Sequence, residues 1–217
     1  MQQTLSKGTV IAGRFEIDSL VNDGALGQIY RATDREKGHA VGIRIIPRTL
    51  LSDADLEMIR KRVPQAAALV HRNIRATYGM GVDQAGFVFI AVEWIEGHNL
   101  KTLLKKRMAA GKRFSFKGAY NIIGHVCNAL TYIHEGTFHG SLSPRAIMVN
   151  DAGRVKIQDL ALSTVRYSKP DYAGRRTVEG AFWAPEVLKN PEHASSVSDI
   201  YSLGAIRSEE HTSELQS

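Results

Sequence analysis

The chain has 217 residues, of which 43% are apolar, and 28 lysines and arginines stand against 22 acidic residues for a net charge of +6. This composition is typical of a globular protein and excludes a collagen-like or wholly disordered chain. The basic residues are spread along the sequence without a helix-turn-helix pattern, so we expect no nucleic-acid partner.

The single cysteine, Cys127, lies in an apolar helical pattern and is predicted to be a small buried side chain. No disulfide can form within the chain, which favours a reducing compartment. No apolar run approaches the ~18 residues that a membrane-spanning helix needs, and residues 1–8 lack the apolar centre of a signal peptide. We therefore expect no membrane segment in this portion and a cytoplasmic location.

The N-terminal part of the chain predicts a β-hairpin. Residues 14–21 alternate between apolar and polar side chains like a strand, and residues 28–32 resume the pattern. Between them residues 22–27 read N-D-G-A-L-G, a glycine-containing turn.

Three further elements are predicted before the middle of the chain. Residues 41–46 form a third strand, and residues 53–69 form a helix that Pro64 should kink or divide in two. Residues 88–97 form a largely apolar strand closed by Gly97.

The centre of the chain predicts two helices. Residues 101–107 read K-T-L-L-K-K-R, which is typical of the solvated face of a short helix. Residues 117–136 predict a core helix closed by Gly136. Its apolar side chains recur at helical spacing, at Ala119, Ile122, Ile123, Val126, Leu130 and Ile133.

Two short strands are predicted after this helix, over residues 147–149 and 155–157, joined by a turn at residues 150–153. The second strand leads to Asp159. Taken alone, this pattern indicates that Asp159 is an ordinary aspartate at the end of a strand.

The stretch from His139 onward decides the interpretation of the chain. Residues 139–147 read H-G-S-L-S-P-R-A-I and resemble the catalytic loop H-R-D-x-K-P-x-N-I of protein kinases. Other kinase landmarks resemble segments of this chain in the family's order: the glycine loop at 22–27, V-G-I-R at 41–44, H-R-N-I at 71–74, D-L-A at 159–161, A-P-E at 184–186 and D-I-Y-S-L-G at 199–204.

The resemblance, closest in type to bacterial Ser/Thr kinases, implies an α+β bilobal fold. A small antiparallel-sheet lobe is expected over residues 14 to about 92, a hinge at 93–97 and a mainly helical lobe at 98–206, after an N-terminal arm at 1–13. Residues 207–217 resemble the translation of a sequencing adapter. We expect them to be an assembly artefact that truncates the second lobe, and a genuine polar tail is the alternative.

Three positions of the catalytic-loop pattern have lost their kinase side chains. The family's Asp accepts the substrate proton, its Lys neutralises the moving phosphoryl group and its Asn holds a metal ion. Here Ser141, Ser143 and Ala146 stand in their places. An aliphatic hydroxyl is not a base near pH 7, and a methyl group cannot bind magnesium.

The charged pair of the small lobe is also altered. Arg44 stands where the resemblance places the phosphate-binding lysine, and Arg62 stands where it places the helix glutamate that pairs with that lysine. Two guanidinium groups are expected to repel rather than pair. Gly140 stands where many kinases carry an arginine that grips a phosphorylated residue.

Parts of a nucleotide site remain. The resemblance implies that ATP would be held by Gly24, Gly27, Ile29, Arg44, Val92, Glu93 and Met148, with Asp159 as the remaining magnesium ligand. These residues could hold ATP with one magnesium ion or with none.

The sequence therefore predicts a pseudokinase domain, regulatory or scaffolding in role, that acts by binding a protein partner such as an active kinase or signalling protein. Two alternatives stay open. One is a divergent Ser/Thr kinase of weak activity that uses Asp159 with a relocated base, and the other is a nucleotide sensor.

Overall fold

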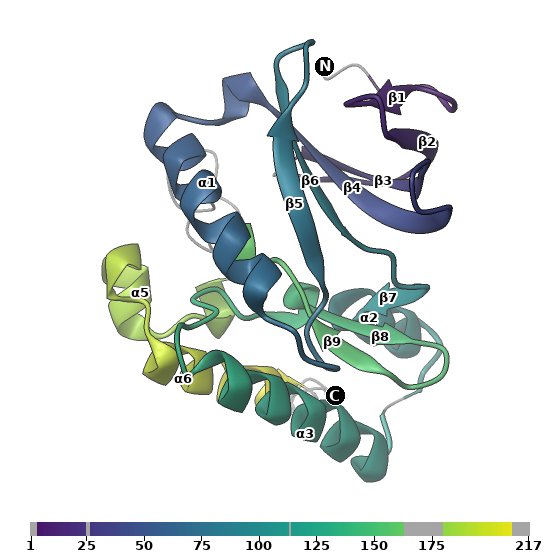
Figure 1. The fold of residues 1–217 in the computed structure, drawn as a ribbon. Helices are drawn as coiled ribbons and strands as arrows, with labels where there is room; N and C mark the ends of the chain where they lie inside the picture. The colour runs from purple at the N-terminus through teal and green to yellow at the C-terminus, as the bar shows by residue number, and fades with distance from the viewer. Residues whose placement is uncertain (1–3, 25–26, 113, 163–179, 210–217) are drawn as a thin grey trace. The chain divides into compact units, whose positions relative to one another are not determined.

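The computed structural model describes residues 4–24, 27–112, 114–162 and 180–209 (Figure 1). Two compact units emerge from these residues. The first unit comprises Met1–Val70 with Ala76–Ile95, and the second comprises His71–Arg75 with Glu96–Ser217. The division after Ile95 falls within the segment that the sequence predicts as a hinge.

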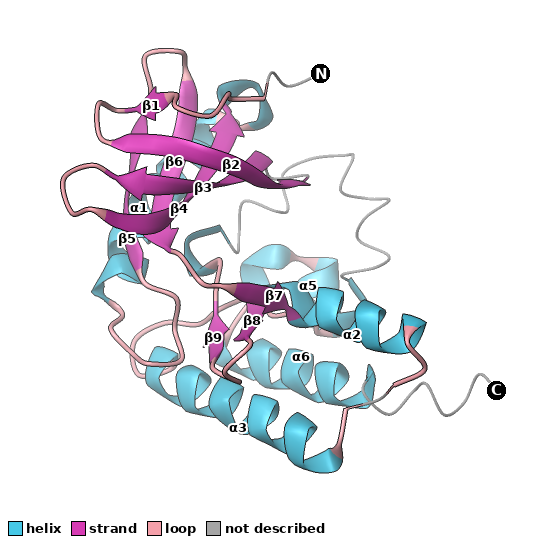
Figure 2. Ribbon diagram, turned by 90° about the vertical axis from the view of Figure 1, so that its right-hand side faces the viewer, coloured by secondary structure: helices cyan, strands magenta, loops and turns pink. Residues whose placement is uncertain are grey.

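The first unit is built on a six-stranded antiparallel sheet with the strand order β1-β2-β3-β4-β6-β5 (Figure 2). The predicted hairpin is confirmed, because β2 and β3 pair until Gly24 stands opposite Gly27. The predicted third strand is confirmed as part of β4. The strands are β1 (Val10–Ile11), β2 (Phe15–Gly24), β3 (Gly27–Asp34), β4 (His39–Pro47), β5 (Thr77–Val82) and β6 (Phe87–Glu93).

One apolar cluster holds the first four strands and β6 together. Ile17, Tyr30, Val41 and Ile43 are 0–1% exposed within it, and Phe89 joins them from β6. Large side chains buried in this way supply most of the free energy that stabilises a sheet. The cluster therefore makes the sheet the core of the first unit.

Helix α1 (Asp53–Ala68) packs beside β5. Its start is specified by a capping box, in which the Ser52 Oγ accepts the Asp55 N–H and the Asp55 carboxylate accepts the Ser52 N–H. The prediction that Pro64 divides the helix is wrong, because α1 continues through it. Pro64 and Arg60, whose carbonyl loses its usual partner, both lie on the exposed side, so water can replace the missing bond.

The predicted strand at residues 88–97 is too long. β6 ends at Glu93, and Gly97 begins β7 (Gly97–Asn99), a strand of the second unit. Strand β5 was not predicted, because glycines at positions 79 and 81 interrupt its apolar pattern.

Residues 4–13 are joined to the sheet by backbone hydrogen bonds. β1 pairs with β2, and the Gly8 N–H donates to the Ile17 carbonyl at 2.8 Å. The Leu5 N–H donates to the Tyr30 hydroxyl at 2.9 Å. The described part of the predicted arm thus belongs structurally to the first unit.

The second unit combines a small sheet with helices (Figure 2). Its three strands pair antiparallel in the order β7-β8-β9, and the strands predicted at 147–149 and 155–157 are confirmed as β8 and β9. The remaining elements are α2 (Leu100–Ala109), α3 (Phe116–Ile133), η2 (Pro144–Ala146), β8 (Ile147–Asn150), β9 (Val155–Ile157), η3 (Leu160–Leu162), η5 (Gly180–Phe182), α5 (Pro185–Lys189), η6 (Pro191–His193) and α6 (Ser196–Glu209).

Helix α3 confirms the predicted core helix, and α2 confirms the short helix before it. Ile122, Val126, Leu130 and Ile133 are buried along the predicted stripe, whereas Ala119 and Ile123 are only half-buried. The prediction that Cys127 is buried is wrong, because its side chain is exposed. One residue along an α-helix turns about 100°, which carries the residue after Val126 away from the packed face.

None of the helices in the described part of the chain combines the length and the apolar character that crossing a bilayer requires.

Candidate functional site

The catalytic-loop segment, residues 139–147, lies between α3 and β8 in the second unit, and Asp199 of α6 fixes its beginning. The Asp199 carboxylate is 1% exposed and accepts the backbone N–H groups of His139 and Gly140, each at 2.7 Å. It also contacts the His134 Nε2 at 3.0 Å. Hydrogen bonds to an ionised acceptor are roughly twice as strong as neutral ones, so this one side chain ties three groups together.

His139 is fully buried, and both of its ring nitrogens form hydrogen bonds. Its Nδ1 lies 3.2 Å from the Ser141 N–H, and its Nε2 lies 3.0 Å from the Gln158 carbonyl. A backbone N–H can only donate and a carbonyl can only accept, which assigns a neutral ring with its proton on Nε2. Because the Nδ1 lone pair already accepts a hydrogen bond, His139 has a structural role and cannot act as the base of a reaction.

Gln158 connects the end of this loop to the residues that precede Asp159. Its N–H donates to the Ala146 carbonyl at 2.8 Å, and its Nε2 donates to the Arg145 carbonyl at 2.8 Å. Its Oε1 accepts the Arg75 Nη1 at 2.7 Å. We call His139, Gln158, Asp199 and Arg75 the frame residues, because the first three bond the backbone of the loop and Arg75 holds the side chain of Gln158.

The positions of the kinase Asp, Lys and Asn are occupied by small uncharged side chains. Ser141 and Ser143 are each 1% exposed, and Ala146 is fully buried. Among the described residues, neither serine Oγ has a hydrogen-bond partner. The three positions therefore carry no ionisable group that could accept a proton, neutralise a phosphoryl group or bind a second metal ion.

Gly140 adopts a left-handed backbone conformation with φ of 80°. A side chain is strained in this region, whereas glycine enters it freely. The glycine therefore lets the loop turn so that its N–H reaches Asp199, and it leaves no cation at the position that grips phosphate in many kinases.

Asp159 also has a left-handed backbone, with φ of 67°, and its side chain is half-buried. Aspartate tolerates this region better than most residues, and such outliers occur often at functional sites. No cluster of three His, Cys, Asp or Glu side chains suited to a metal ion occurs in the described portion. Magnesium is commonly held by one or two carboxylates plus substrate phosphates, so Asp159 could bind one such ion, whereas the methyl group of Ala146 could bind none.

In the first unit, the packing of β3 against β4 is enough to explain why position 27, one of the two glycines predicted to bind nucleotide, is a glycine. Gly27 is buried with φ of 88°, and a Cβ placed there would lie 1.9 Å from the Ile45 carbonyl oxygen. Any other residue would push β3 and β4 apart. A glycine at position 27 is therefore required whether or not phosphate binds.

The other residues predicted to bind nucleotide lie on the sheet strands or, for one, in the second unit. Ile29 and Arg44 stand opposite each other on β3 and β4, and Val92 on β6 pairs with β4. The Glu93 carboxylate accepts the Ala76 N–H at 3.1 Å, which fixes the end of β6. Met148 lies on β8 of the second unit.

Arg62 is half-buried on α1, and both it and Arg44 make interactions with other groups. The expected repulsion between the two guanidinium groups stays a prediction. A single nucleotide site that uses residues of both units also stays a prediction.

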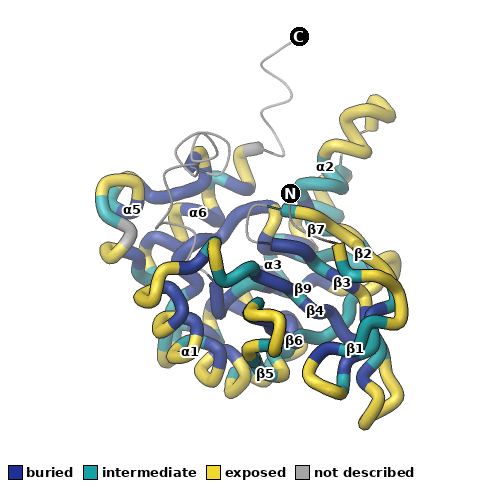
Figure 3. The backbone as a smooth tube through the Cα atoms, turned by 90° about the horizontal axis from the view of Figure 1, so that it is seen from above, coloured by how far each residue is buried: buried dark blue, intermediate teal, exposed yellow. Residues whose placement is uncertain are grey.

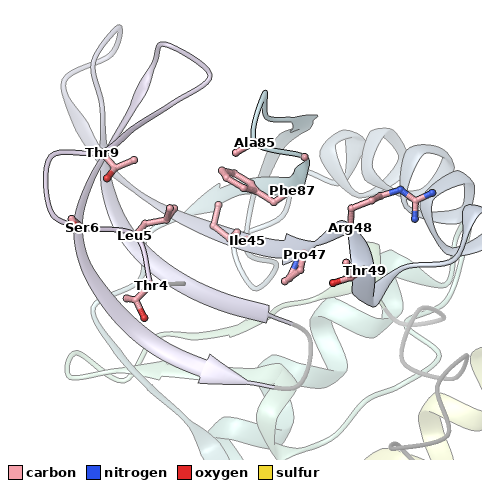
Figure 4. Close-up of a pocket in the computed structure, with 11 residues that line it drawn as sticks. Thr4, Leu5, Ser6, Thr9, Ile45, Pro47, Arg48, Thr49, Ala85 and Phe87 are labelled. Atoms are coloured by element: carbon pink, nitrogen blue, oxygen red, sulfur yellow. The ribbon is translucent and has the colours of Figure 1, made fainter. Parts of the chain in front are cut away.

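A cavity of about 480 Å³ lies in the first unit, between the N-terminal segment and the ends of β4 and β6 (Figure 4). None of the residues predicted to bind nucleotide lines this cavity, although Arg44 precedes the lining residue Ile45 on β4. It is lined by residues 4–6, 9, 45, 47–49 and 85–87.

A paired carboxylate at the base of the hairpin in the first unit has a lowered pKa. Arg14 makes two hydrogen bonds to the Asp34 carboxylate, at 2.7 and 2.9 Å. These bonds lower the pKa of Asp34 from 3.8 to about 2 and outweigh the opposing effect of burial. The pair stabilises the start of β2 against the end of β3.

Comparison with known proteins agrees with this architecture. The model of the protein kinase domain family matches residues 15–215, so the chain belongs to the protein kinase family. Members of this family use ATP and magnesium. The solved kinase domain of Mycobacterium tuberculosis PknI covers 94% of this chain with a TM-score of 0.77 at 18% identity, and 76% of that domain is matched. The bilobal kinase fold predicted from the sequence is confirmed.

The relatives are bacterial Ser/Thr kinases. The chain is 26% identical over 206 residues to serine/threonine-protein kinase PknA of Mycobacterium tuberculosis, covering 92% of this chain and 47% of that protein. It is 29% identical over 205 residues to the probable serine/threonine-protein kinase PknB of Corynebacterium glutamicum, covering 91% and 31%. The chain thus spans less than half the length of these relatives.

Sequence reasoning found the replaced positions but missed the roles of the frame residues. The D-I-Y-S-L-G motif places Asp199 at the start of a helix but does not indicate its bonds, and no motif includes Gln158 or Arg75. The partners of Asp199 lie 59 and 60 residues away in the sequence, and Arg75 lies 83 residues from Gln158. The kinase-like spacing of residues 139 and 199 was the one signal that could have linked two of them.

Proposed function

We propose that this chain is a pseudokinase domain of the bacterial Ser/Thr type, which binds a protein partner and transfers little or no phosphate. One observation carries the proposal. The loop that performs chemistry in the family has a hydrogen-bonded frame here, while Ser141, Ser143 and Ala146 place two hydroxyls and a methyl group at the positions of the family's base, cation and metal ligand.

The size of the expected catalytic loss supports this proposal. Phosphoryl transfer relies on positioning and on electrostatic stabilisation. Removing a general base typically costs about 10²- to 10⁴-fold in rate, and removing an electrostatic stabiliser costs about 10²- to 10³-fold. Even with strong non-additivity, loss of both groups together leaves activity near background.

Nucleotide binding without transfer is the second candidate, a nucleotide sensor. By the family resemblance, Arg44 would meet a phosphate group with positive charge, and Asp159 would bind one magnesium ion. The left-handed Asp159 favours this candidate, because a strained conformation is retained at the one remaining metal-ligand position.

A weakly active kinase is the third candidate, and it needs a relocated base. His139 does not fit that role, because its Nδ1 accepts a backbone N–H and its ring is fully buried. His134 is held by Asp199. Neither histidine of the loop region is therefore available to take a proton from a substrate hydroxyl.

A thermal-shift experiment on the full-length protein separates these candidates. Unfolding would be followed with ATP and magnesium, with ATP and a chelator, and without ligand. At a hundred times its Kd a nucleotide stabilises the folded state by about 2.7 kcal/mol, which raises Tm by roughly 5–10 °C in a domain of this size. The scaffold proposal predicts no rise under either condition.

The variant Asp159→Asn provides the matched control. A rise that needs magnesium and disappears in this variant would establish the sensor and replace the simple scaffold. A rise that persists in the variant would show that nucleotide binding does not need Asp159 and would contradict the role given to it.

A further inference from the structure

The segment around α2 and α3 has an unusual charge. Residues 97–134 contain no aspartate or glutamate, although the whole chain has 22 acidic residues. The same segment holds seven basic residues: Lys101, Lys105, Lys106, Arg107, Lys112, Arg113 and Lys117. Basic residues occur along the whole chain, but here no acidic residue offsets them, so this segment attracts an anionic surface more strongly than its share of the basic residues alone would suggest.

The turn between the two helices brings part of this charge together. The Lys112 N–H donates to the Arg107 carbonyl at 2.8 Å, and the Arg107 guanidinium lies 4.2 Å from the centre of the Phe114 ring. The Ser115 Oγ accepts the Gly118 N–H and caps α3. We call the described residues of 105–120 the α2–α3 tip. In Figure 3 the end of α2 is coloured as exposed.

Large apolar side chains are also exposed on the tip. Met108 is 68% exposed, Phe116 77% and Tyr120 73%. Phe116 and Tyr120 stack on successive turns of α3 with their ring centres 6.4 Å apart. Lys105, Lys112 and Lys117 are exposed beside them in the sequence, and among the described residues none of the three forms an ion pair. The tip thus presents cations and uncovered apolar groups together.

We propose that the α2–α3 tip binds the surface of an anionic lipid bilayer. Lysines near such a surface are attracted by the negative headgroups, and aromatic side chains are favoured at the boundary between headgroups and acyl chains. A nucleic acid or an acidic protein would satisfy the charge but would not explain the exposed methionine and phenylalanine. A bilayer accepts both, because its interface takes apolar side chains without a complementary pocket.

Co-sedimentation of the full-length protein with vesicles tests this proposal. The vesicles would contain phosphatidylcholine alone or phosphatidylcholine mixed with phosphatidylglycerol. We expect binding to the mixed vesicles only, weakening as salt is added. Each lysine near the surface contributes about fivefold to partitioning, so the triple variant Lys105→Gln, Lys112→Gln, Lys117→Gln should bind about a hundredfold more weakly.

A matched control separates the tip from net charge. The variant Lys7→Gln, Lys61→Gln, Lys189→Gln changes the charge by the same amount at exposed lysines outside the tip and should bind like the parent. If the two triple variants lost vesicle binding equally, the proposal would be overturned, because binding would then depend on the net charge of the protein and not on the tip.

The apolar contribution has its own pair of variants. Phe116→Ser with Tyr120→Ser should weaken vesicle binding at least tenfold, whereas Val70→Ser with Val82→Ser, which removes exposed apolar groups elsewhere, should not change it. Binding to a single-stranded DNA oligonucleotide or to an acidic polypeptide, with none to the anionic vesicles, would also overturn the proposal. All variants should give the circular dichroism spectrum of the parent.

Discussion

Two sets of buried polar groups in and around the catalytic loop differ in their hydrogen bonding. The Asp199 carboxylate contacts three groups, and His139 and Gln158 are bonded through several of their atoms. The hydroxyls of Ser141 and Ser143 are equally buried and have no partner within the described structure. The frame of the loop and its chemistry therefore depend on different residues, and the chemistry can be absent while the frame holds its shape.

The difference has a physical reason. A frame residue satisfies backbone N–H and carbonyl groups that would otherwise be buried without partners, which makes it a folding requirement. A group that performs chemistry on a substrate is often left incompletely bonded in the protein so that it can interact with that substrate. Three predictions test this contrast and a fourth tests an ion pair outside the loop, beginning with the largest expected effect.

Removing the Asp199 carboxylate should have the greatest effect. Asp199→Ala leaves the N–H groups of His139 and Gly140 buried without an acceptor, and each such group costs about 1–3 kcal/mol. We expect the free energy of unfolding to fall by about 2–6 kcal/mol, measured by urea denaturation. Asp151→Ala in an exposed turn is the control and should change it by less than about 0.5 kcal/mol. An unchanged midpoint of urea denaturation for Asp199→Ala would contradict the claim that the frame residues stabilise the fold.

Removing the amide of Gln158 should have the next largest effect. Gln158→Leu keeps the volume of the side chain but deprives the Arg75 Nη1 and the Arg145 carbonyl of a partner. A loss of about 1–3 kcal/mol is expected in the same denaturation experiment. Gln65→Leu, on the exposed side of α1, serves as the comparison. Equal behaviour of the two variants would show that Gln158 does not support the loop.

The first unit offers a charge-dependent test outside the loop. The pKa of Asp34 is about 2 in the folded protein and 3.8 when unperturbed, so the Arg14 pair stabilises the fold above about pH 4. That stabilisation, about 2 kcal/mol, is lost as the pH falls through 3.8 toward 2. Denaturation measured across this range should show the loss in the parent and a flatter profile in Asp34→Asn. A profile that Asp34→Asn leaves unchanged would contradict the assignment.

The replaced positions should respond least. Ser141→Ala and Ser143→Ala each remove a buried hydroxyl without a partner, so the free energy of unfolding should stay the same or rise by up to about 1 kcal/mol. Ser202→Ala is the matched control, because its buried hydroxyl donates to the Ser198 carbonyl at 2.9 Å, and it should lose about 1 kcal/mol. A comparable loss for Ser141→Ala would show that its hydroxyl is bonded after all.

The sequence allowed the local elements to be predicted where their periodicity was strong. The hairpin, the strand at 41–46 and the stripe of α3 followed from alternation and helical spacing. Strand β5 was missed because two glycines break its pattern, and Cys127 was misplaced because a position one residue from the stripe looks apolar in the sequence but faces solvent. The effect of Pro64 was overestimated because its exposure could not be foreseen.

The candidate site divides in the same way. Motif spacing located Ser141, Ser143 and Ala146, since these positions are defined by their neighbours in the chain. The frame could not be predicted, because the bonds of Asp199 and Arg75 join segments about 60 to 80 residues apart. Such contacts depend on how α6 and the segment at 71–75 pack around the loop, which local patterns do not encode.

The most direct test of the central claim is the transfer of labelled phosphate from ATP, with magnesium, by the full-length protein to itself and to a general protein substrate. The account predicts no transfer above that of Asp159→Asn measured in parallel, although both proteins fold with the same cooperative unfolding transition. Transfer by the parent protein that Asp159→Asn abolishes would contradict it, because the chemistry would then have survived the replacement of the base, the cation and the metal ligand by Ser141, Ser143 and Ala146.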